Sequence, residues 1–187
     1  MSRLPDLVAL AIVGVGLPLR TGALAGQQSP EAPAAAPTPA PKPCTAPEYR
    51  QFDFWIGSWD VVDPKGEPQG SNVIGSILGG CVLQESWTGL SGMVGTSFNI
   101  WDVAAKRWRQ SWVDNQGLVL LLEGEFRDDK MVLEGRRPAR KGGTALHRIT
   151  WNRIGGDPDR VRQLWEVSPD DGKSWQILFD GTYRRKS

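Results

Sequence analysis

The chain has 187 residues, with 22 basic and 21 acidic side chains, so its net charge at neutral pH is close to zero. Nucleic-acid-binding proteins usually carry a clear basic surplus, so no nucleic-acid partner is expected. The length allows one ordinary domain and some additional segments.

Residues 1–25 are predicted to form a secretory signal peptide. Arg3 lies near the start, an apolar run extends from Leu7 to Leu19, and the small residues "ALA" at 23–25 match a cleavage site. The apolar run is shorter than the roughly 20 residues of a membrane span. We therefore expect a bacterial protein that is periplasmic or secreted, soluble after signal cleavage, and not inserted into the membrane.

Residues 26–47 are rich in proline and alanine, as in "SPEAPAAAPTPAPKP". Such a segment buries too little apolar surface to offset the entropy of ordering its backbone, so we expect a disordered, extended linker. The folded domain is then expected to occupy residues 48–187, which is long enough for one hydrophobic core.

Cys44 and Cys81 are the two cysteines of the chain, and both follow the predicted signal. In an oxidising compartment an isolated pair most simply forms a disulfide, which would stabilise the fold by roughly 3–4 kcal/mol. A redox-active pair is the alternative, although the CxxC spacing typical of such pairs is missing. With one histidine and two bonded cysteines, no metal site is expected.

From Gly57 onward, polar and apolar residues alternate with a period of two between glycine-rich turns, which predicts short β-strands. A short N-terminal helical turn is expected around residues 46–56, where the aromatic residues of "FDFWIGSW" begin. About ten short strands in one domain are typical of a sandwich or a closed barrel. The expected strands are 58–62, 72–78, 82–88, 95–101, 107–113, 118–126, 130–135, 145–151, 160–167 and 174–184.

The tripeptide "GSW" at 57–59 places Gly-x-Trp at the entrance of the first strand. This arrangement resembles the calycins, the superfamily of the lipocalins, in which the first-strand tryptophan plugs one end of the barrel and an arginine of the last strand stacks on it. The resemblance implies a single antiparallel up-and-down barrel closed by Trp59. Arg184 or its neighbour Arg185 would be the partner, and we assign this role to Arg184. An indole beneath a guanidinium plane excludes water over a large area.

Five longer motifs extend over the whole expected domain: "FDFWIGSWDV", "GCVLQESW", "RWRQSWVDNQG", "RQLWEVSPDDGKSW" and "FDGTYRR". Together they resemble an uncharacterised family of exported bacterial proteins, a domain of unknown function placed among the calycin-like barrels. The resemblance implies the barrel fold. It implies no catalytic residue, because that family has no settled activity.

Three expected strands each carry a polar residue, a spacer and a tryptophan: Glu85-x-Trp87, Gln110-x-Trp112 and Gln163-x-Trp165. Side chains alternate between the two faces of a strand. The arginines of "RWRQSW" and "RVRQLW" should face water, which turns the glutamines and tryptophans toward the barrel axis. His147 and Trp151 share the expected inner face of strand 145–151.

A lumen lined by indoles and a few hydrogen-bonding groups suits a small, partly apolar ligand. The predicted ligand-binding residues are Glu85, Trp87, Gln110, Trp112, Gln163, Trp165, His147 and Trp151. The alternative is a barrel filled by its tryptophans, with the polar groups paired to one another or to buried water.

Glu85 is expected to have a raised pKa, because burial beside Trp87 disfavours the charged carboxylate. It could anchor a ligand or act as a general acid or base, and a purely structural role is also open. Asp114 could supply a second carboxylate, but "VDNQG" is typical of a turn. No cofactor is expected, and haem bound through His147 is kept as an alternative to a hydrogen-bonded core histidine.

The sequence thus predicts an exported barrel that binds a small molecule, with no assigned catalytic residue. Two other functions remain open. One is an enzyme that uses Glu85 as acid or base on a ligand in the barrel, and the other is a structural envelope module with a solid core. The sequence determines neither the ligand nor the oligomeric state.

Overall fold

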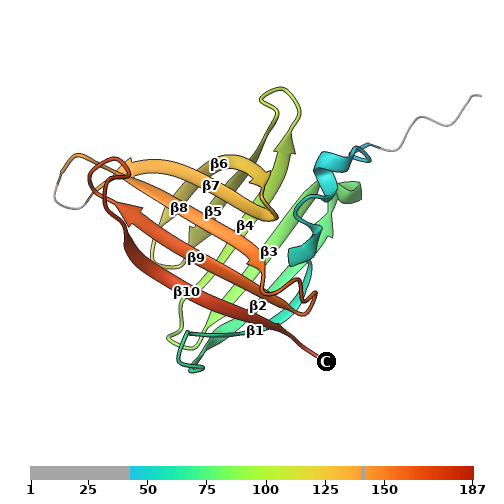
Figure 1. The fold of residues 1–187 in the computed structure, drawn as a ribbon, viewed down its shortest axis with the longest axis horizontal. Helices are drawn as coiled ribbons and strands as arrows, with labels where there is room; N and C mark the ends of the chain where they lie inside the picture. Colours follow the sequence, from blue (N-terminus) through green and yellow to red (C-terminus); the bar gives the residue numbers. More distant parts are fainter. Residues whose placement is uncertain (1–42, 140–141) are drawn as a thin grey trace, which may run out of the picture. The chain divides into compact units, whose positions relative to one another are not determined.

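The computed structural model describes residues 43–139 and 142–187. In this part of the chain, ten antiparallel strands form one closed barrel in which sequence neighbours pair and β1 pairs with β10 (Figure 1). The predicted all-β, up-and-down barrel of ten strands is therefore confirmed. The strands are β1 (Gly57–Val62), β2 (Pro68–Ile77), β3 (Val82–Gly89), β4 (Val94–Asp102), β5 (Arg107–Asp114), β6 (Val119–Arg127), β7 (Lys130–Pro138), β8 (Thr144–Arg153), β9 (Arg160–Ser168) and β10 (Gln176–Arg185).

All ten predicted strands are present, and the largest difference is the start of β2, which begins at Pro68 rather than at residue 72. Gly70 of this extra segment lies opposite Gly89 of β3, and a Cβ on Gly70 would stand 2.3 Å from the carbonyl oxygen of Thr88. The two backbones therefore approach closely only because both residues are glycines. Glycine has little strand propensity of its own, so the pattern of the sequence does not reveal this pairing.

One end of the barrel is closed by the segment that precedes β1. Two short 3-10 turns, η1 (Pro47–Arg50) and η2 (Asp53–Trp55), lie at this end (Figure 1, cyan). Phe52 and Trp55 stack with their ring centroids 5.0 Å apart, and both contact Trp151 of β8. Phe52 also contacts Trp108 of β5 edge to face. We call these four residues, which are almost completely buried, the aromatic plug.

Trp59 of β1 is fully buried beside the plug, and its Nε1 donates a hydrogen bond to the carbonyl of Trp55 at 3.0 Å. The guanidinium of Arg185 lies over the Trp59 ring, 4.2 Å from its centroid. The assignment of this role to Arg184 is therefore wrong by one residue. Adjacent side chains of a strand point to opposite faces, and Arg185 shares its face with the buried Tyr183.

Cys44 and Cys81 form the predicted disulfide. Cys44 precedes η1, and Cys81 follows η3 (Leu78–Gly80), the turn between β2 and β3. The bond spans a sequence separation of 37 residues and ties the N-terminal segment to the barrel wall. A hydrogen bond from the Arg50 guanidinium to the carbonyl of Gly80 supports the same contact. The aromatic plug is thus held in place covalently as well as by packing.

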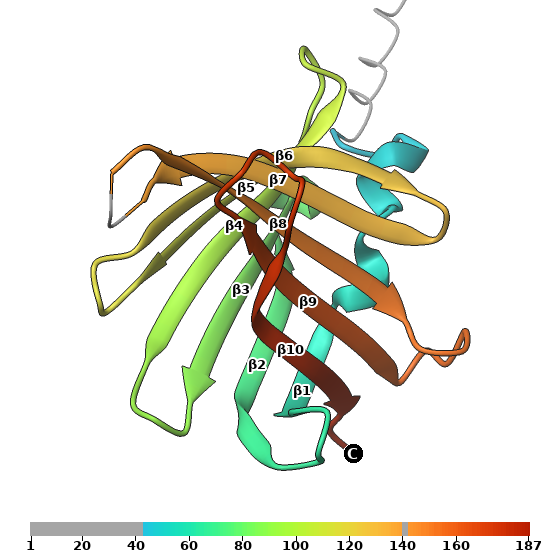
Figure 2. The ribbon, with the colours of Figure 1, turned by 60° about the vertical axis from the view of Figure 1, so that its left-hand side comes forward.

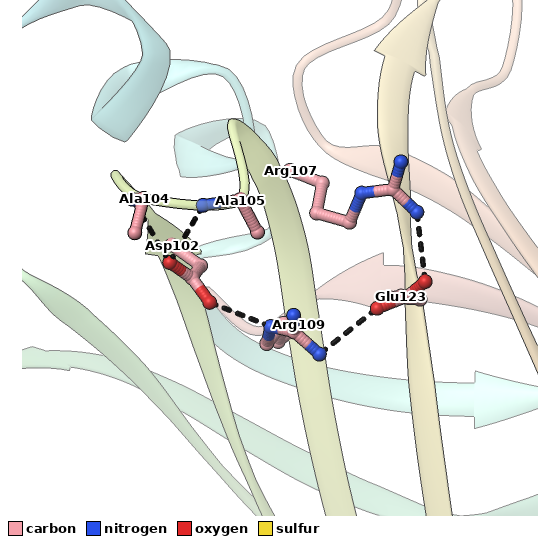
Figure 3. A network of polar contacts seen from close by, with 6 residues as sticks. All are labelled: Asp102, Ala104, Ala105, Arg107, Arg109 and Glu123. Atoms are coloured by element: carbon pink, nitrogen blue, oxygen red, sulfur yellow. Dashed lines mark hydrogen bonds and ion pairs between the residues drawn. The ribbon is translucent and has the colours of Figure 1, made fainter.

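The outer face of β5 carries its arginines. Arg107 and Arg109 bind opposite oxygens of Glu123 on β6, at 2.7 and 2.9 Å, and Arg109 also binds Asp102 at 2.7 Å (Figure 3). Exposed ion pairs of this kind add little stability. Their arginines lie on the solvent-exposed face of β5. The alternate residues, including the buried Gln110, therefore lie on the inner face, as predicted.

The predicted signal peptide, residues 1–25, and residues 26–42 of the predicted linker lie outside the described residues. Of the remaining linker, Cys44 is bonded as above, and Pro47 already belongs to η1. In the part of the chain that the structure describes, no helix is both long and apolar enough to cross a membrane.

Candidate functional site

A cavity of about 220 Å³ lies inside the barrel, toward the end away from the aromatic plug. Figure 2 shows the β3–β4 and β5–β6 turns at that end, and Met93 of the β3–β4 turn is part of the lining. The lining residues are Glu85, Trp87, Met93, Gln110, Trp112, Leu120, Ile149, Gln163, Trp165, Leu178, Phe179 and Tyr183.

The lining has two layers along the strands. Strands β3, β5 and β9 run from the plugged end toward the open end, so on each of them the polar residue precedes the tryptophan and lies deeper. The tryptophans and Phe179 form an aromatic rim, and the polar groups with Tyr183 form a polar floor. The rim is Trp87, Trp112, Trp165 and Phe179, and the floor is Glu85, Gln110, Gln163 and Tyr183. Six of the eight predicted ligand-binding residues therefore border one cavity.

Glycines on neighbouring strands make room for the rim. A Cβ on Gly95 of β4 would stand 2.3 Å from Cζ2 of Trp112, and a Cβ on Gly181 of β10 would stand 2.6 Å from the Phe179 ring. These rings lie against bare backbone, where any other residue would place a side chain in the same space. The aromatic groups can therefore lie along the wall and leave the lumen open.

Glu85 stands at the centre of the polar floor and is almost completely buried. Its Oε1 accepts a hydrogen bond from Nδ2 of Asn72 at 2.7 Å, and its Oε2 accepts one from the Ser97 hydroxyl at 2.6 Å. Neither partner is charged, and no cation of the described residues forms an ion pair with this carboxyl group. Burial raises the pKa of Glu85 to about 7, and the two hydrogen bonds offset only part of this effect.

The hydrogen bonds continue on both sides of Glu85. Asn72 also donates to the Tyr183 hydroxyl at 3.2 Å, and that hydroxyl donates to Oε1 of Gln163 at 2.5 Å. On the other side, Nε2 of Gln110 donates to Oδ1 of Asn99 at 2.8 Å. Burial, together with the nearby Glu85 carboxylate, raises the pKa of Tyr183 well above its usual value, so this phenol stays a donor.

Two side-chain amide atoms of the floor have no hydrogen-bond partner among the described residues. Oε1 of Gln110 and Nε2 of Gln163 receive no partner from residues 43–139 or 142–187, although both side chains border the cavity. One is an acceptor and the other a donor. The floor can therefore offer a ligand both kinds of hydrogen bond, with the Glu85 carboxyl group between them.

Asp114 serves a turn, as the sequence indicated. Its Oδ1 accepts hydrogen bonds from the backbone N–H groups of Gln116 and Leu118, at 2.9 and 3.0 Å. Its Oδ2 accepts one from Nε1 of Trp112 at 3.3 Å, which fixes the indole of the rim. Asp114 therefore positions a lining residue without lining the cavity itself.

His147 and Trp151 are the two predicted ligand-binding residues that do not border the cavity. Trp151 lies in the aromatic plug, because it is close to the end of β8 that lies at the closed end of the barrel. His147 lies behind Trp165, whose Nε1 donates to Nδ1 of the imidazole at 3.1 Å. Burial, with a contribution from Arg137, lowers the pKa of His147, so it is a neutral acceptor that orients a lining indole.

This position gives the haem alternative no support, since the imidazole lies outside the cavity lining. Among the described residues there is also no group of three or more histidine, cysteine, aspartate or glutamate side chains that could hold a metal ion.

Asn72 on β2 and Ser97 on β4, which bind the Glu85 carboxyl group, were not among the predicted site residues. Ser97 and Asn99 are fully buried, whereas Phe98 and Ile100 between and beyond them are 46% and 38% exposed. Simple alternation would predict the reverse, with the apolar residues inside. A signal was available: Asn99-x-Trp101 repeats the polar–x–Trp spacing of the neighbouring strands, and Ser97 shares that face.

A scan against protein-family models finds no family that matches this chain, and a search of curated proteins finds no matching relative.

Proposed function

We propose that the barrel binds a small, partly apolar molecule in the cavity, with Glu85, Gln110 and Gln163 orienting it. The observation that carries this proposal is the layered lining: an aromatic rim above a hydrogen-bonded polar floor. Apolar walls with a few convergent polar groups are typical of small-molecule sites. The cavity volume, about 220 Å³, is below the roughly 300–1,000 Å³ of most such sites, which favours a small ligand.

The same proposal places the protein among calycin-like barrels exported by bacteria. The Arg185 guanidinium over the buried Trp59 at the closed end supports the calycin likeness. The Cys44–Cys81 disulfide supports an oxidising compartment such as the periplasm. The motifs that resemble the exported family of unknown function extend over the same barrel.

Binding is better supported than catalysis. Acid–base catalysis commonly uses two titrating groups that both reach the reacting atoms. The other titratable group of the lining is Tyr183, and its hydroxyl is engaged by both Asn72 and Gln163. The cavity also counts against a barrel packed solid from end to end.

Fluorescence titration with N-phenyl-1-naphthylamine, a neutral apolar probe, tests the proposal. We expect the probe to brighten on binding, and we expect Trp112→Ala and Trp165→Ala each to weaken its affinity by about tenfold or more, because each removes a wall of the cavity. Trp175→Ala is the matched control, since this indole packs against the Arg148 guanidinium and not in the lining. Binding that is unchanged in both rim variants would contradict the proposal.

Native mass spectrometry of the protein purified from its host envelope addresses the natural ligand. We expect a co-purifying small molecule, and we expect its occupancy to drop in Trp165→Ala but not in Trp175→Ala. If the purified protein carries no small molecule and does not bind the probe, a structural envelope module with a solid core would explain the protein better than ligand binding.

A further inference from the structure

The cavity contains, among the described residues of its lining, an acidic side chain but no basic one. Among the residues that line it there is one carboxyl group, Glu85, and there is no arginine, lysine or histidine. The arginines of β5 and β9 point outward, where Arg109 pairs with Asp102 and Arg162 with Asp180. A ligand that enters the lumen is therefore exposed to the Glu85 carboxyl group. No basic side chain in the described part of the chain neutralises this group.

In the described part of the chain, the floor also offers free acceptors to a donating ligand, beside one free donor, Nε2 of Gln163. The Glu85 oxygens accept one hydrogen bond each from Asn72 and Ser97, and each oxygen has a further lone pair. Oε1 of Gln110 is an acceptor without a protein partner in the described residues. An N–H-bearing group could bind to Glu85 and Gln110 together.

The aromatic rim adds a third feature. Trp87, Trp112, Trp165 and Phe179 surround the lumen above the floor. Aromatic faces attract cations, and indoles do so most strongly. Asp114, which holds the Trp112 indole, adds a negative charge next to the rim.

Building on the proposed function, we infer that the ligand is a small organic cation: a protonated amine on a ring or short apolar body, with its ammonium group against Glu85 and its body within the aromatic rim. Such a ligand supplies the missing counter-charge, donates to the free acceptors and presents apolar surface to the indoles. An anion would meet the Glu85 carboxylate with no basic group in the lining to offset it.

The pH dependence of binding follows from the groups around Glu85. The side chains that face it from β2, β4, β5 and β9 are the uncharged Asn72, Ser97, Gln110 and Gln163, and Tyr183 faces it from β10. His147 on β8 and Arg137 on β7 lie outside the lining. Glu85, with a pKa raised to about 7, is thus the group that titrates near neutrality at this site. Below that pH an entering cation must displace a proton, so its affinity falls.

Calorimetric titration with three matched compounds tests the inference: 2-phenylethylammonium, 2-phenylethanol and phenylacetate, which share one ring and chain and differ in charge. At about pH 8 we expect the ammonium to bind about tenfold or more tightly than the alcohol, because a hydrogen bond to a charged partner is stronger than a neutral one. Phenylacetate should bind most weakly.

Between about pH 8 and about pH 5.5 the ammonium should lose about tenfold in affinity, since Glu85 becomes protonated while an alkylammonium, with a pKa near that of lysine, stays charged. The alcohol should change by less than about threefold, because its binding is not linked to the charge of Glu85. Glu85→Gln, which keeps the shape of the side chain, should remove the preference for the ammonium and retain alcohol binding. The pH series on the unmodified protein tests the role of the Glu85 charge in the same way, without the need for a variant.

The outcomes separate the two proposals. If N-phenyl-1-naphthylamine binds the cavity but the alcohol or phenylacetate equals or exceeds the ammonium at about pH 8, the cation inference is wrong and the binding function stands. If neither the probe nor any of the three compounds binds, the binding function itself fails. A preference for the ammonium that persists in Glu85→Gln would also overturn the inference, because the charge would then be recognised elsewhere.

Discussion

The two ends of the barrel use the same residue types in opposite ways. At the closed end, Trp55 and Trp151 pack against each other and against Phe52, and no part of these rings is exposed. At the open end, Trp112 and Trp165 lie along the wall, remain partly exposed and border a cavity. A tryptophan in this molecule therefore indicates neither a core nor a binding site by itself.

The neighbours of each ring make the difference. The closed end receives extra aromatic side chains from the turns before β1, and these fill the space between the strands. The open end has glycines beneath its rings and a polar floor below them. One end is therefore suited to stability and the other to binding, and variants at matched positions can test this division.

The largest difference is expected between Trp151→Ala and Trp165→Ala. Trp151→Ala should lower the free energy of unfolding by about 3–5 kcal/mol, because it leaves a large void among fully buried rings. Trp165→Ala removes a partly exposed ring beside an existing cavity, so it should cost less than about 2 kcal/mol while it weakens probe binding. Chemical denaturation followed by far-UV circular dichroism measures both. Equal losses of stability would mean that the two ends do not differ in this way.

Glu85, which lies between the two ends, should make stability depend on pH. Its pKa is raised in the folded protein from 4.5 to about 7, so the folded state binds more protons than the unfolded chain between these values. The stabilisation is present below about pH 4.5 and is lost as the pH rises through about 7, by about 3 kcal/mol in all, since each pKa unit corresponds to about 1.4 kcal/mol.

Glu85→Gln should remove this loss, so the difference in unfolding free energy between the variant and the unmodified protein should grow in favour of the variant from about pH 5 to about pH 8. Taking this difference cancels the contribution of His147, whose lowered pKa acts in the opposite direction. Urea denaturation at several pH values provides the measurement. A difference that does not vary with pH would mean that Glu85 ionises normally in the folded barrel.

The smallest effect is expected for the glycines of the wall. Gly95→Ala should cost about 1–3 kcal/mol and weaken probe binding, because its Cβ would overlap the Trp112 ring and push it into the lumen. Gly75→Ala on β2 is the control, since nothing lies within 4 Å of its added Cβ, and its effect should stay within about 0.5 kcal/mol. Thermal unfolding together with the probe titration compares the two. If Gly95→Ala binds the probe normally, the space beneath the rim is not needed.

Much of the fold could be predicted because the signals are local. Alternation and glycine-rich turns gave ten strands, and the pair of cysteines predicted the bond between Cys44 and Cys81. The arginines of β5 predicted the inner face of that strand, because a guanidinium in a barrel wall needs water or a counter-charge. The site was predicted in part by the same logic, since Gln110 and Trp112 lie opposite those arginines.

Other parts of the site depend on contacts between distant residues. Ser97 and Asn99 are buried although the apolar residues next to them are exposed, and this is explained only by Glu85 on β3 and Gln110 on β5, the two strands that flank β4. The involvement of Tyr183 requires β10 to lie beside β1 and within reach of Asn72 on β2. Sequence separation of 111 residues between these two side chains hides their contact from any local pattern.

By itself, the sequence determined ten short strands, a disulfide and polar–x–Trp strands facing inward, because strand geometry and the need of charged groups for water act over a few residues. A closed barrel, rather than a sandwich, was implied by the resemblance to the calycins. Only the tertiary structure decided which aromatic residues fill the barrel and which surround a cavity. Whether a ring is packed or borders the cavity depends on its position along the barrel axis. It also depends on its neighbour at that position, which is either an aromatic side chain from the turns before β1 or a glycine of an adjacent strand. The closure of the whole sheet sets the position and the neighbour.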